Sequence, residues 1–391
     1  MTHIALPARN RQTFFSGTKI AWPAESQSLV CEVVDASDWD RIAATFEGIS
    51  QEQTYTFGKL RWPAASQEAR IFKTGGEIVG GAIMRTQKLP LGLGAISVCK
   101  WGPILKDNLR PDRNAIYRGM IAALVDEYAY RRRNLLSVMV RSSADDTDHQ
   151  YEILKSFGFR EGTQIAYPSR YLVNLKISED EQRASFEQKW RYHLRRAEKA
   201  GLTFHHAGPS DLGEFDRIYR SMSERKRFPD YSAYNSLSGQ ISMNVAALQP
   251  EIFFVRKDGE TLAGAVIFKA GDTAAYLYGA TTDAALPLRA GYLMHWEIIR
   301  WLKANTGVRW YDLGGSDGFH GLHQFKKGMV GAAGRIVSLP PMANLAVYRS
   351  TQIMGGAALA GRDVIMKFKH TLRSRWSGEA RPDQNVTTGG G

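Results

Sequence analysis

The feature of this sequence that most constrains its fold is an order of elements that occurs twice. Residues 69–86 predict two strands joined by a glycine turn, and residues 252–269 predict the same hairpin with Asp258-Gly259 at the turn. Each hairpin is followed by an apolar strand, a helix with one apolar stripe and a further strand, and matching points lie roughly 170 to 180 residues apart. An offset close to half of the 391 residues indicates two copies of one domain.

The order of elements also predicts the fold class. Helices are predicted before the hairpins, at 36–51 and 211–223, and after the third strand of each copy, at 115–132 and 291–303. This order is typical of mixed α/β (α+β) domains, in which a mostly antiparallel mixed sheet is flanked by helices. Neither GxGxxG nor GxxxxGK[ST] is present, so a dinucleotide-binding domain or a P-loop is not expected.

The composition excludes several classes of protein. With 43% hydrophobic residues, 17 Phe, 16 Tyr and 9 Trp, the chain can bury sizeable cores, yet no apolar run approaches the ~20 residues of a membrane span. Cys31 and Cys99 are too few for a disulfide framework, and no Cys/His spacing predicts a metal site. The first residues contain no apolar signal sequence, so the expected location is cytoplasmic.

The net charge is strongly positive. The 51 Lys and Arg residues against 39 Asp and Glu give a formal charge of +12, which favours anionic partners such as nucleic acid, phosphorylated substrates or an acidic membrane surface. The excess is concentrated in runs at 131–133, 189–199, 225–227 and 367–376. By default each run is interpreted as an ordinary solvated helix face, so charge alone does not select the partner.

The repeat predicts two domains with additional segments at both ends of the chain. The five parts are residues 1–30 (N-terminal extension), 31–175 (first domain), 176–335 (second domain), 336–370 (a C-terminal helix returning toward the first domain) and 371–391 (a disordered tail). The domain boundary is expected within 170–185, because a strand at 171–175 is followed by an acidic turn suited to a helix N-terminus. The C-terminal helix is expected over 344–368.

Four strings resemble motifs of one protein family, in the same order along the chain. They are TYTFGKLRW (54–62), KWGP (100–103), WRYHLRRAEKAGL (190–202) and YDLGGSDGFHGLHQFKKGMVG (311–331). The element order is similar to that of N-acetyltransferases (GNAT), and the strings resemble the Fem family of peptidyltransferases, which are tandem GNAT-like proteins. The likeness spans about residues 30 to 340. Phe57 and Arg61 replace the Trp and Lys of the family, and Met329 stands where an aromatic residue is usual.

The resemblance implies a specific reaction. Fem proteins move an amino acid from aminoacyl-tRNA to an amine of a peptidoglycan precursor, so the expected activity is aminoacyl transfer to this or another cell-envelope precursor. The expected partners are aminoacyl-tRNA, as co-substrate, and a lipid-linked or nucleotide-linked precursor, without a bound cofactor or metal. A peripheral position at the inner face of an anionic membrane is compatible with the positive charge.

Aminoacyl transfer needs a group that stabilises the tetrahedral oxyanion and a group that accepts a proton from the amine. The resemblance implies that Lys326, in GLHQFKKG, supplies the cation. If this string is aligned with the family motif one residue further along, the catalytic lysine is Lys327 instead. Lys327 is therefore kept as a substrate-binding candidate. Asp107, after the Gly-Pro turn, is a candidate for proton handling, and Asp312 is predicted to cap the loop ahead of Lys326.

Other candidates concern the substrate. The resemblance assigns Arg227 and Tyr231 to the precursor and places Arg61 where the family has a phosphate-contacting lysine. A guanidinium suits this role because it binds phosphates and carboxylates bidentately. Tyr276 and Tyr278 alternate in AAYLYGAT and are predicted to face the same side of a strand, either toward a substrate or in the core.

Two other functions remain open. An acyl-CoA-dependent GNAT-type N-acyltransferase acting on a polysaccharide or small amine would need a Gly-rich loop at a helix N-terminus, of which only Arg289-Ala290-Gly291 is present. A non-catalytic protein could use the basic runs to bind nucleic acid or an anionic membrane surface. The sequence contains neither HExxH nor GxSxG, so metallohydrolase and serine hydrolase functions are disfavoured.

Overall fold

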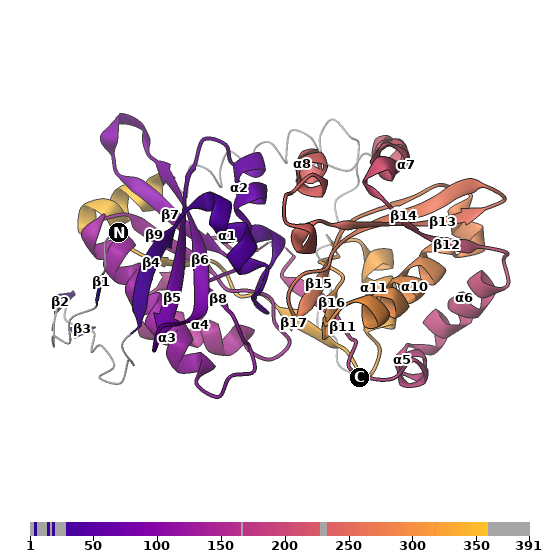
Figure 1. The fold of residues 1–391 in the computed structure, drawn as a ribbon, viewed down its shortest axis with the longest axis horizontal. Helices are drawn as coiled ribbons and strands as arrows, with labels where there is room; N and C mark the ends of the chain where they lie inside the picture. Colours follow the sequence, from indigo (N-terminus) through magenta and orange to yellow (C-terminus); the bar gives the residue numbers. More distant parts are fainter. Residues whose placement is uncertain are drawn as a thin grey trace, which may run out of the picture.

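The computed structural model describes residues 29–165, 167–226, 233–316 and 318–358, together with the backbone of three two-residue strands near the N-terminus. These residues form two lobes that lie side by side (Figure 1). Each lobe is built on one sheet, which is mostly antiparallel but contains a parallel pair, β7–β9 in the first lobe and β15–β16 in the second. The predicted mixed α/β architecture with two similar domains is confirmed.

The first sheet has the strand order β1-β4-β5-β6-β7-β9-β18-β10, with β8 paired to β6. Its strands are β1 (Ile4–Ala5), β4 (Val30–Val34), β5 (Ser66–Thr74), β6 (Glu77–Lys88), β7 (Ala95–Lys100), β8 (Ile104–Leu105), β9 (Leu135–Met139), β10 (Arg160–Glu161) and β18 (Ala343–Leu345). The helices of this lobe are α1 (Ala36–Ala43), the 3-10 helix η1 (Gln51–Gln53), α2 (Tyr55–Arg61), α3 (Arg113–Leu124), the π-helix η3 (Val125–Arg131) and α4 (Thr147–Ser156). A separate hairpin joins β2 (Phe14–Phe15) to β3 (Thr18–Lys19).

The second sheet has the strand order β12-β13-β14-β15-β16-β11-β17. Its strands are β11 (Ser169–Asn174), β12 (Thr203–Ala207), β13 (Glu251–Lys257), β14 (Glu260–Phe268), β15 (Thr273–Thr281), β16 (Trp310–Asp312) and β17 (Arg335–Ser338). Its helices are α5 (Glu179–Ser185), α6 (Gln188–Glu198), α7 (Leu212–Lys226), the 3-10 helix η5 (Tyr234–Ser236), α8 (Leu237–Ile241), α9 (Ala285–Leu288), α10 (Ala290–Asn305) and α11 (His320–Val330). One face of the sheet packs against α6, α10 and α11, and the other against α7 and α8.

The two predicted hairpins are present as β5–β6 and β13–β14. In the second, Asp258 and Gly259 adopt φ angles of 50° and 83°. Positive φ at both central residues is what a tight two-residue hairpin needs, because it matches the twist of the strands. The helix N-terminus predicted at the acidic turn is present at α5. Ser178 and Glu181 bond each other's backbone N–H there and so form a capping box.

The last strand of each half lies in the sheet of the other half. β11 pairs with β16 and β17 in the second sheet, whereas β18 pairs with β9 and β10 in the first. The predicted domain boundary at 175 therefore lies too late, because the second sheet already includes Ser169. The exchange covers the outer edge of each parallel pair, which would otherwise expose unpaired backbone groups.

The C-terminal segment returns to the first lobe as predicted, but it does so first as a strand. Asn344, expected in a helix, lies at the centre of β18, where its side chain accepts a hydrogen bond from Ser137 at 2.6 Å. A helix then occupies 349–358 against the first lobe (Figure 1), with Gly355 beside Leu135. The rest of the predicted helix and the predicted tail at 371–391 lie outside the described residues.

The lobes are joined by a shared hydrophobic core. Trp39 and Phe46 of the first lobe pack in one cluster with Leu248 and Phe268 of the second, and all four side chains are buried. Gly271 approaches the backbone of the first lobe so closely that an added Cβ would lie 2.7 Å from a carbonyl oxygen. Contacts this tight fix the position of one lobe against the other.

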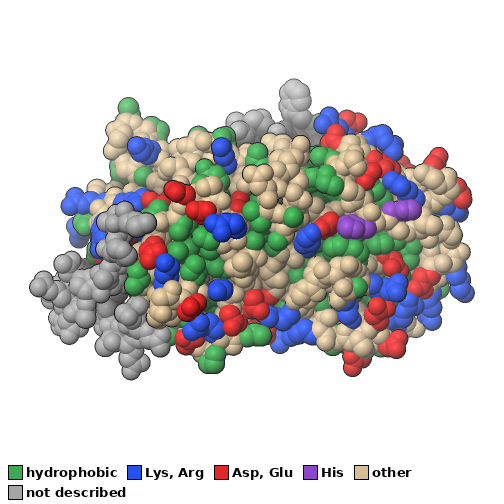
Figure 2. All heavy atoms as spheres, in the orientation of Figure 1, with side chains coloured by type: hydrophobic (Ala, Val, Ile, Leu, Met, Phe, Trp, Pro, Cys, Tyr) green, Lys and Arg blue, Asp and Glu red, His purple; other side chains and the backbone are tan. Residues whose placement is uncertain are grey.

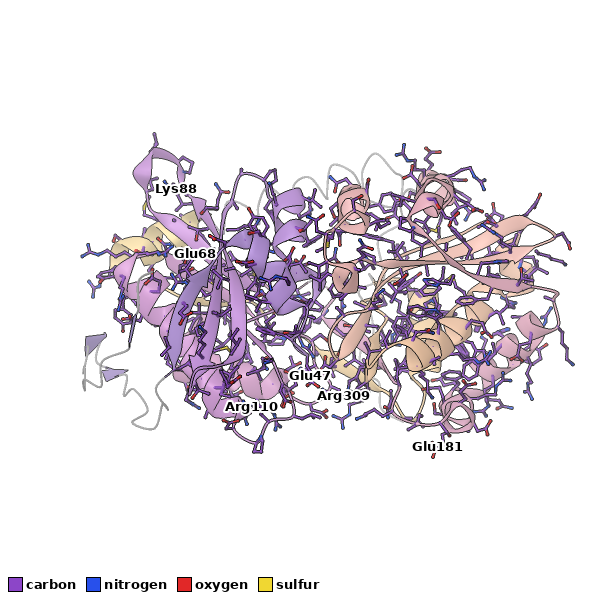
Figure 3. The ribbon with its side chains drawn as sticks, in the orientation of Figure 1. Glu47, Glu68, Lys88, Arg110, Glu181 and Arg309 are labelled. Carbon is purple, nitrogen blue, oxygen red and sulfur yellow. The ribbon has the colours of Figure 1, made fainter. Side chains whose placement is uncertain are left out.

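Beside this core lies an ion network that also crosses the junction. Asp272 accepts hydrogen bonds from Arg141 at 2.6 Å and Asn108 at 2.7 Å, and Arg309 pairs with Glu47 at 2.8 Å. Figure 3 shows Glu47 and Arg309 together where the lobes meet. Because Asp272 is buried, its charge depends on these partners.

Candidate active site

Lys326 is buried in the second lobe, where backbone carbonyls hold its ammonium group. Its side chain is carried by α11, and Nζ donates hydrogen bonds of 2.5 Å to the carbonyls of Leu313 and Gly315. Burying a charge is costly unless such partners compensate for the lost water. The adjacent Lys327 is exposed, so α11 directs Lys326 and not Lys327 toward the interior.

The turn that holds Lys326 is anchored by Asp312. One carboxylate oxygen of Asp312 accepts the N–H of Gly314 at 2.9 Å, and the other accepts two hydrogen bonds from Arg170, at 2.8 and 3.1 Å. The prediction that Asp312 caps this loop is confirmed. Gly314 has a φ of 76°, and a Cβ there would lie 3.7 Å from Nζ of Lys326. Glycine thus permits the turn and leaves space beside the ammonium.

The first lobe reaches this turn through Trp101. The guanidinium of Arg170 lies 4.9 Å from the centre of the ring of Trp101, which directly follows β7, so this cation–π contact joins the two lobes. Trp101 has a φ of 57°, a conformation that is strained for a bulky residue. Such strain is retained where the surroundings fix a side chain in place, and here it aims the indole at Arg170.

Tyr276 on β15 lies next to Lys326. The ammonium is 5.8 Å from the centre of its ring, and burial raises the pKa of the phenol, so the hydroxyl stays protonated. Gly279 makes room for this side chain, because a Cβ at that position would lie 1.5 Å from the Tyr276 hydroxyl. The parallel pairing of β15 and β16 ends at Ala275, immediately before Tyr276. Tyr276 and Lys326 therefore meet where the two strands separate.

His295 completes the surroundings of Lys326. Its Nδ1 lies 3.0 Å from the Tyr311 hydroxyl, and its ring is 4.9 Å from that of Tyr276. Burial, and then the charge of Lys326, lowers the pKa of His295 to about 3. The imidazole is therefore neutral at physiological pH and adds no second positive charge beside the ammonium.

Tyr278 does not join Tyr276, so the prediction that both face the same side is wrong. The register shifts between Val266 and Ile267, which makes Leu277 an extra residue in β15 and turns Tyr278 to the other face of the sheet. Tyr278 packs there against Tyr234, with ring centres 5.3 Å apart. A β-bulge cannot be recognised from alternating residues alone.

The other candidates are dispersed. Asp107 is exposed and accepts the N–H of Leu109, and it lies beside Asn108, which contacts Asp272 at the start of β15. Because Lys326 binds carbonyls beyond the end of β16, the structure does not bring Asp107 to the ammonium. Arg61 ends α2, where the preceding Leu60 contacts Gly239 of α8 across the lobes.

The predicted site residues and those of the structure differ in two further respects. Arg227 and Tyr231 lie outside the described residues. Sequence reasoning missed Arg170 and His295, for which the available signals were a charged residue at the start of an apolar strand and a histidine on the apolar stripe of a helix. In the described part of the chain, no three His, Cys, Asp or Glu residues gather to hold a metal, and no helix is both long and apolar enough to span a bilayer.

A cavity of about 600 Å³ lies away from this site, between residues 175–179 and 303–309. Its lining does not include Leu313, Gly315 or Tyr276, which surround Lys326. The candidate site is thus defined by its chemistry: a fixed ammonium, a protonated phenol and a neutral imidazole around the opening between β15 and β16. A fixed ammonium of this kind can stabilise negative charge that develops on an oxygen atom.

Comparisons with known proteins bear on the fold and the family. A model of the FemAB family matches residues 127–234, and an acetyltransferase (GNAT) domain model matches residues 184–327. The crystal structure of FemX is similar with a TM-score of 0.67 at 15% sequence identity, over 83% of this chain and 99% of FemX. A conserved protein of unknown function from Bacteroides thetaiotaomicron matches with a TM-score of 0.52 at 11% identity, over 80% of this chain and 98% of that one. No curated protein sequence matches.

Proposed function

Because this chain is a tandem GNAT-like protein of the Fem family, we propose that it is an aminoacyltransferase, which moves an amino acid from aminoacyl-tRNA to an amine of a cell-envelope precursor. The observation that carries the proposal is the buried ammonium of Lys326, fixed by the carbonyls of Leu313 and Gly315. An ester under attack develops an oxyanion, and a fixed donor of this kind typically contributes about 3 to 4 kcal/mol.

The reaction assigns a role to each group around Lys326. The amine nitrogen of the precursor forms a bond to the carbonyl carbon, the ester C–O bond breaks, and the proton lost by the amine balances the one gained by the leaving 3′ oxygen. Lys326 stabilises the oxyanion, and the protonated Tyr276 can donate a further hydrogen bond. His295 stays neutral and keeps the ring of Tyr276 in place. This chemistry needs no bound cofactor or metal.

The acceptor is proposed to be anionic. The net charge of +12 favours a substrate that carries phosphates or carboxylates, and Arg61 at the end of α2 is a suitable contact for them. Lys327, exposed one residue after Lys326, remains a candidate for substrate binding. A cytoplasmic enzyme, at most peripheral to the membrane, would have access to both substrates.

The direct test is incubation of the protein with a mixed pool of charged tRNAs and envelope precursors, followed by mass spectrometry. The expected result is a gain in precursor mass equal to one aminoacyl residue, lost when the tRNA is deacylated beforehand. Transfer that proceeds instead with acyl-CoA and without tRNA would contradict the proposal and support the acyl-CoA alternative.

A further inference from the structure

A line of exposed residues runs along α6. Lys189, Tyr192, Arg196 and Lys199 are separated by three or four residues, so they project from one side of the helix and its C-cap. We propose that this basic stripe, defined by these four residues, binds the phosphodiester backbone of the RNA that carries the donor amino acid. The inference rests on the proposed function and adds a docking surface for the body of the RNA.

The charges of the basic stripe are not used within the fold. Among the residues that the structure describes, Lys189, Arg196 and Lys199 take part in no ion pair. Nearby cations differ, because Arg183 pairs with Glu198 and Arg191 donates hydrogen bonds to backbone carbonyls. Figure 2 shows Lys and Arg side chains at the right end of the second lobe, with a few acidic ones between them. Unpaired cations in a row are suited to a repeating anion.

Helix stability does not account for the basic stripe. A positive charge near the C-terminus of a helix is stabilised by the helix dipole, which explains Arg196 and Lys199. Lys189, however, lies in the first turn of α6, where the same dipole disfavours a positive charge. Tyr192 is 51% exposed, and the guanidinium of Arg196 lies 6.0 Å from its ring centre. An exposed aromatic ring between cations offers a stacking surface as well as charge.

Polar atoms beside the basic stripe also lack partners. His193 is 9% exposed, and its Nδ1 has no hydrogen-bond partner; the same holds for the buried Nε of Arg289, at the start of α10, and for Nε1 of Trp190. Burial and the charges of Arg289, Lys189 and Arg196 lower the pKa of His193, so these cations converge on one place. Buried polar atoms are normally paired, which indicates that a polar ligand approaches here.

The basic stripe is connected to the candidate active site by one layer of aromatic side chains. The ring of Tyr292 lies 4.9 Å from the rings of both His193 and Phe325, and Phe325 directly precedes Lys326. Trp190 contacts the rings of Tyr292 and Phe325, at 5.2 and 6.2 Å. An RNA bound along α6 could therefore place its aminoacylated 3′ end near Lys326.

The chemistry of α6 favours RNA over a membrane surface. An interfacial helix inserts an apolar face into lipid, but the apolar residues of α6 (Trp190, Leu194 and Ala197) are buried inside the lobe. The ten steps along the helix from Lys189 to Lys199 correspond to about 15 Å. At roughly 3.4 Å per nucleotide along a duplex, this length matches about four phosphates of one strand.

The test compares two double variants that lose the same charge. Lys189→Ala/Arg196→Ala removes two cations of the basic stripe, and Lys88→Ala/Arg160→Ala removes two exposed cations of the first lobe. Binding of uncharged tRNA is measured between 50 and 200 mM salt. Two lost phosphate contacts should reduce the slope of log Kd against log salt by about 1.5, while the control retains the wild-type slope. Equal slopes in both variants would overturn the inference.

Two further arms separate this inference from the proposed function. With aminoacylated tRNA, the variant Lys189→Ala/Arg196→Ala should show a higher KM and an unchanged kcat. With a short aminoacylated 3′-end oligonucleotide, which does not reach the basic stripe, the variant and the wild type should have the same KM and kcat.

If the wild type transfers from tRNA and the variant has the same KM, the inference fails while the proposed function stands. If the variant loses binding to phosphatidylglycerol vesicles but not to tRNA, the stripe is a membrane surface and the inference is wrong. If the wild type binds tRNA through the stripe but transfers nothing, the proposed function fails alone.

Discussion

Arg170 and Asp312 form an ion pair of 2.8 Å between β11 and β16, one residue contributed by each half of the chain. Asp312 holds the turn whose carbonyls bind Lys326, and Arg170 contacts Trp101 of the first lobe. The position of the candidate catalytic ammonium is therefore coupled to the contact between the lobes. The geometry of the candidate active site therefore depends on residues from both halves of the chain.

Replacement of Arg170 should destabilise the protein. In Arg170→Ala the carboxylate of Asp312, whose side chain is only 1% exposed, loses its charged partner, and the free energy of unfolding should fall by roughly 3 kcal/mol. Arg41→Ala is the control, because Arg41 pairs with Asp38 on the surface and its loss should cost less than about 1 kcal/mol. Chemical denaturation measures both values. Similar small losses in the two variants would show that the buried pair is not needed.

Lys326→Ala should abolish most of the turnover without unfolding the protein. Removal of one fixed donor to the oxyanion typically lowers kcat by about 10² to 10³-fold. Lys327→Ala is the matched control: Lys327 is exposed, so loss of a substrate contact there should change KM, while kcat stays within a few-fold of the wild type. Single-turnover rates with charged tRNA test this, with circular dichroism to verify folding. Equal effects of the two substitutions would contradict the assignment.

Gly279→Ala should displace Tyr276. The added Cβ would overlap the Tyr276 hydroxyl, so we expect a loss of about 1 to 3 kcal/mol in the free energy of unfolding and a lower kcat. In the double variant with Tyr276→Leu the overlap is removed, and stability should recover while turnover stays low. Thermal unfolding and activity are measured on the same samples. Recovery of turnover in the double variant would show that Tyr276 has no part in the reaction.

The junction between the lobes should weaken in acid. Burial by itself would raise the pKa of Asp272, but the charge and hydrogen bond of Arg141, with those of Thr273 and Asn108, hold it below its usual value. A carboxylate whose pKa is lower in the folded than in the unfolded state contributes stability above the unfolded pKa of about 3.9, and this contribution is lost as the pH falls through the folded pKa.

The corresponding experiment is denaturation of the wild type and Asp272→Asn at a series of pH values. The wild type should lose stability steeply below about pH 4, whereas Asp272→Asn should be less stable at neutral pH but depend less on pH in that range. Parallel curves for the two proteins would show that another group controls the acid transition.

Much of the fold could be predicted because it is encoded locally. The turn at Asp258-Gly259, the helix start at the acidic turn before α5 and the apolar stripe of α10 each depend on neighbouring residues, and all three are present in the structure. Lys326 was selected from a resemblance, and its burial against two carbonyls distinguishes it from Lys327.

The remaining features depend on contacts between distant segments. Nothing in the sequence near Ser169 shows that β11 crosses to the second sheet. The pattern around Asn344 predicts a helix, because pairing with β9 cannot be recognised in a short apolar segment. The bulge at Leu277 arises from the register of β14 against β15. Arg170 acts through Asp312, which is 142 residues away along the chain, and no local pattern could reveal that pair.

The exchange of β11 and β18 has a consequence for biosynthesis. As the ribosome releases the chain, the first lobe emerges with β9 and β10 but must wait for β18, which is translated only after the whole second lobe. Until then a gap separates two strands of its sheet, and a nascent chain from another ribosome could fill it. The two lobes are thus committed to mature together, and a gene split between them would deliver two halves that are each missing a strand.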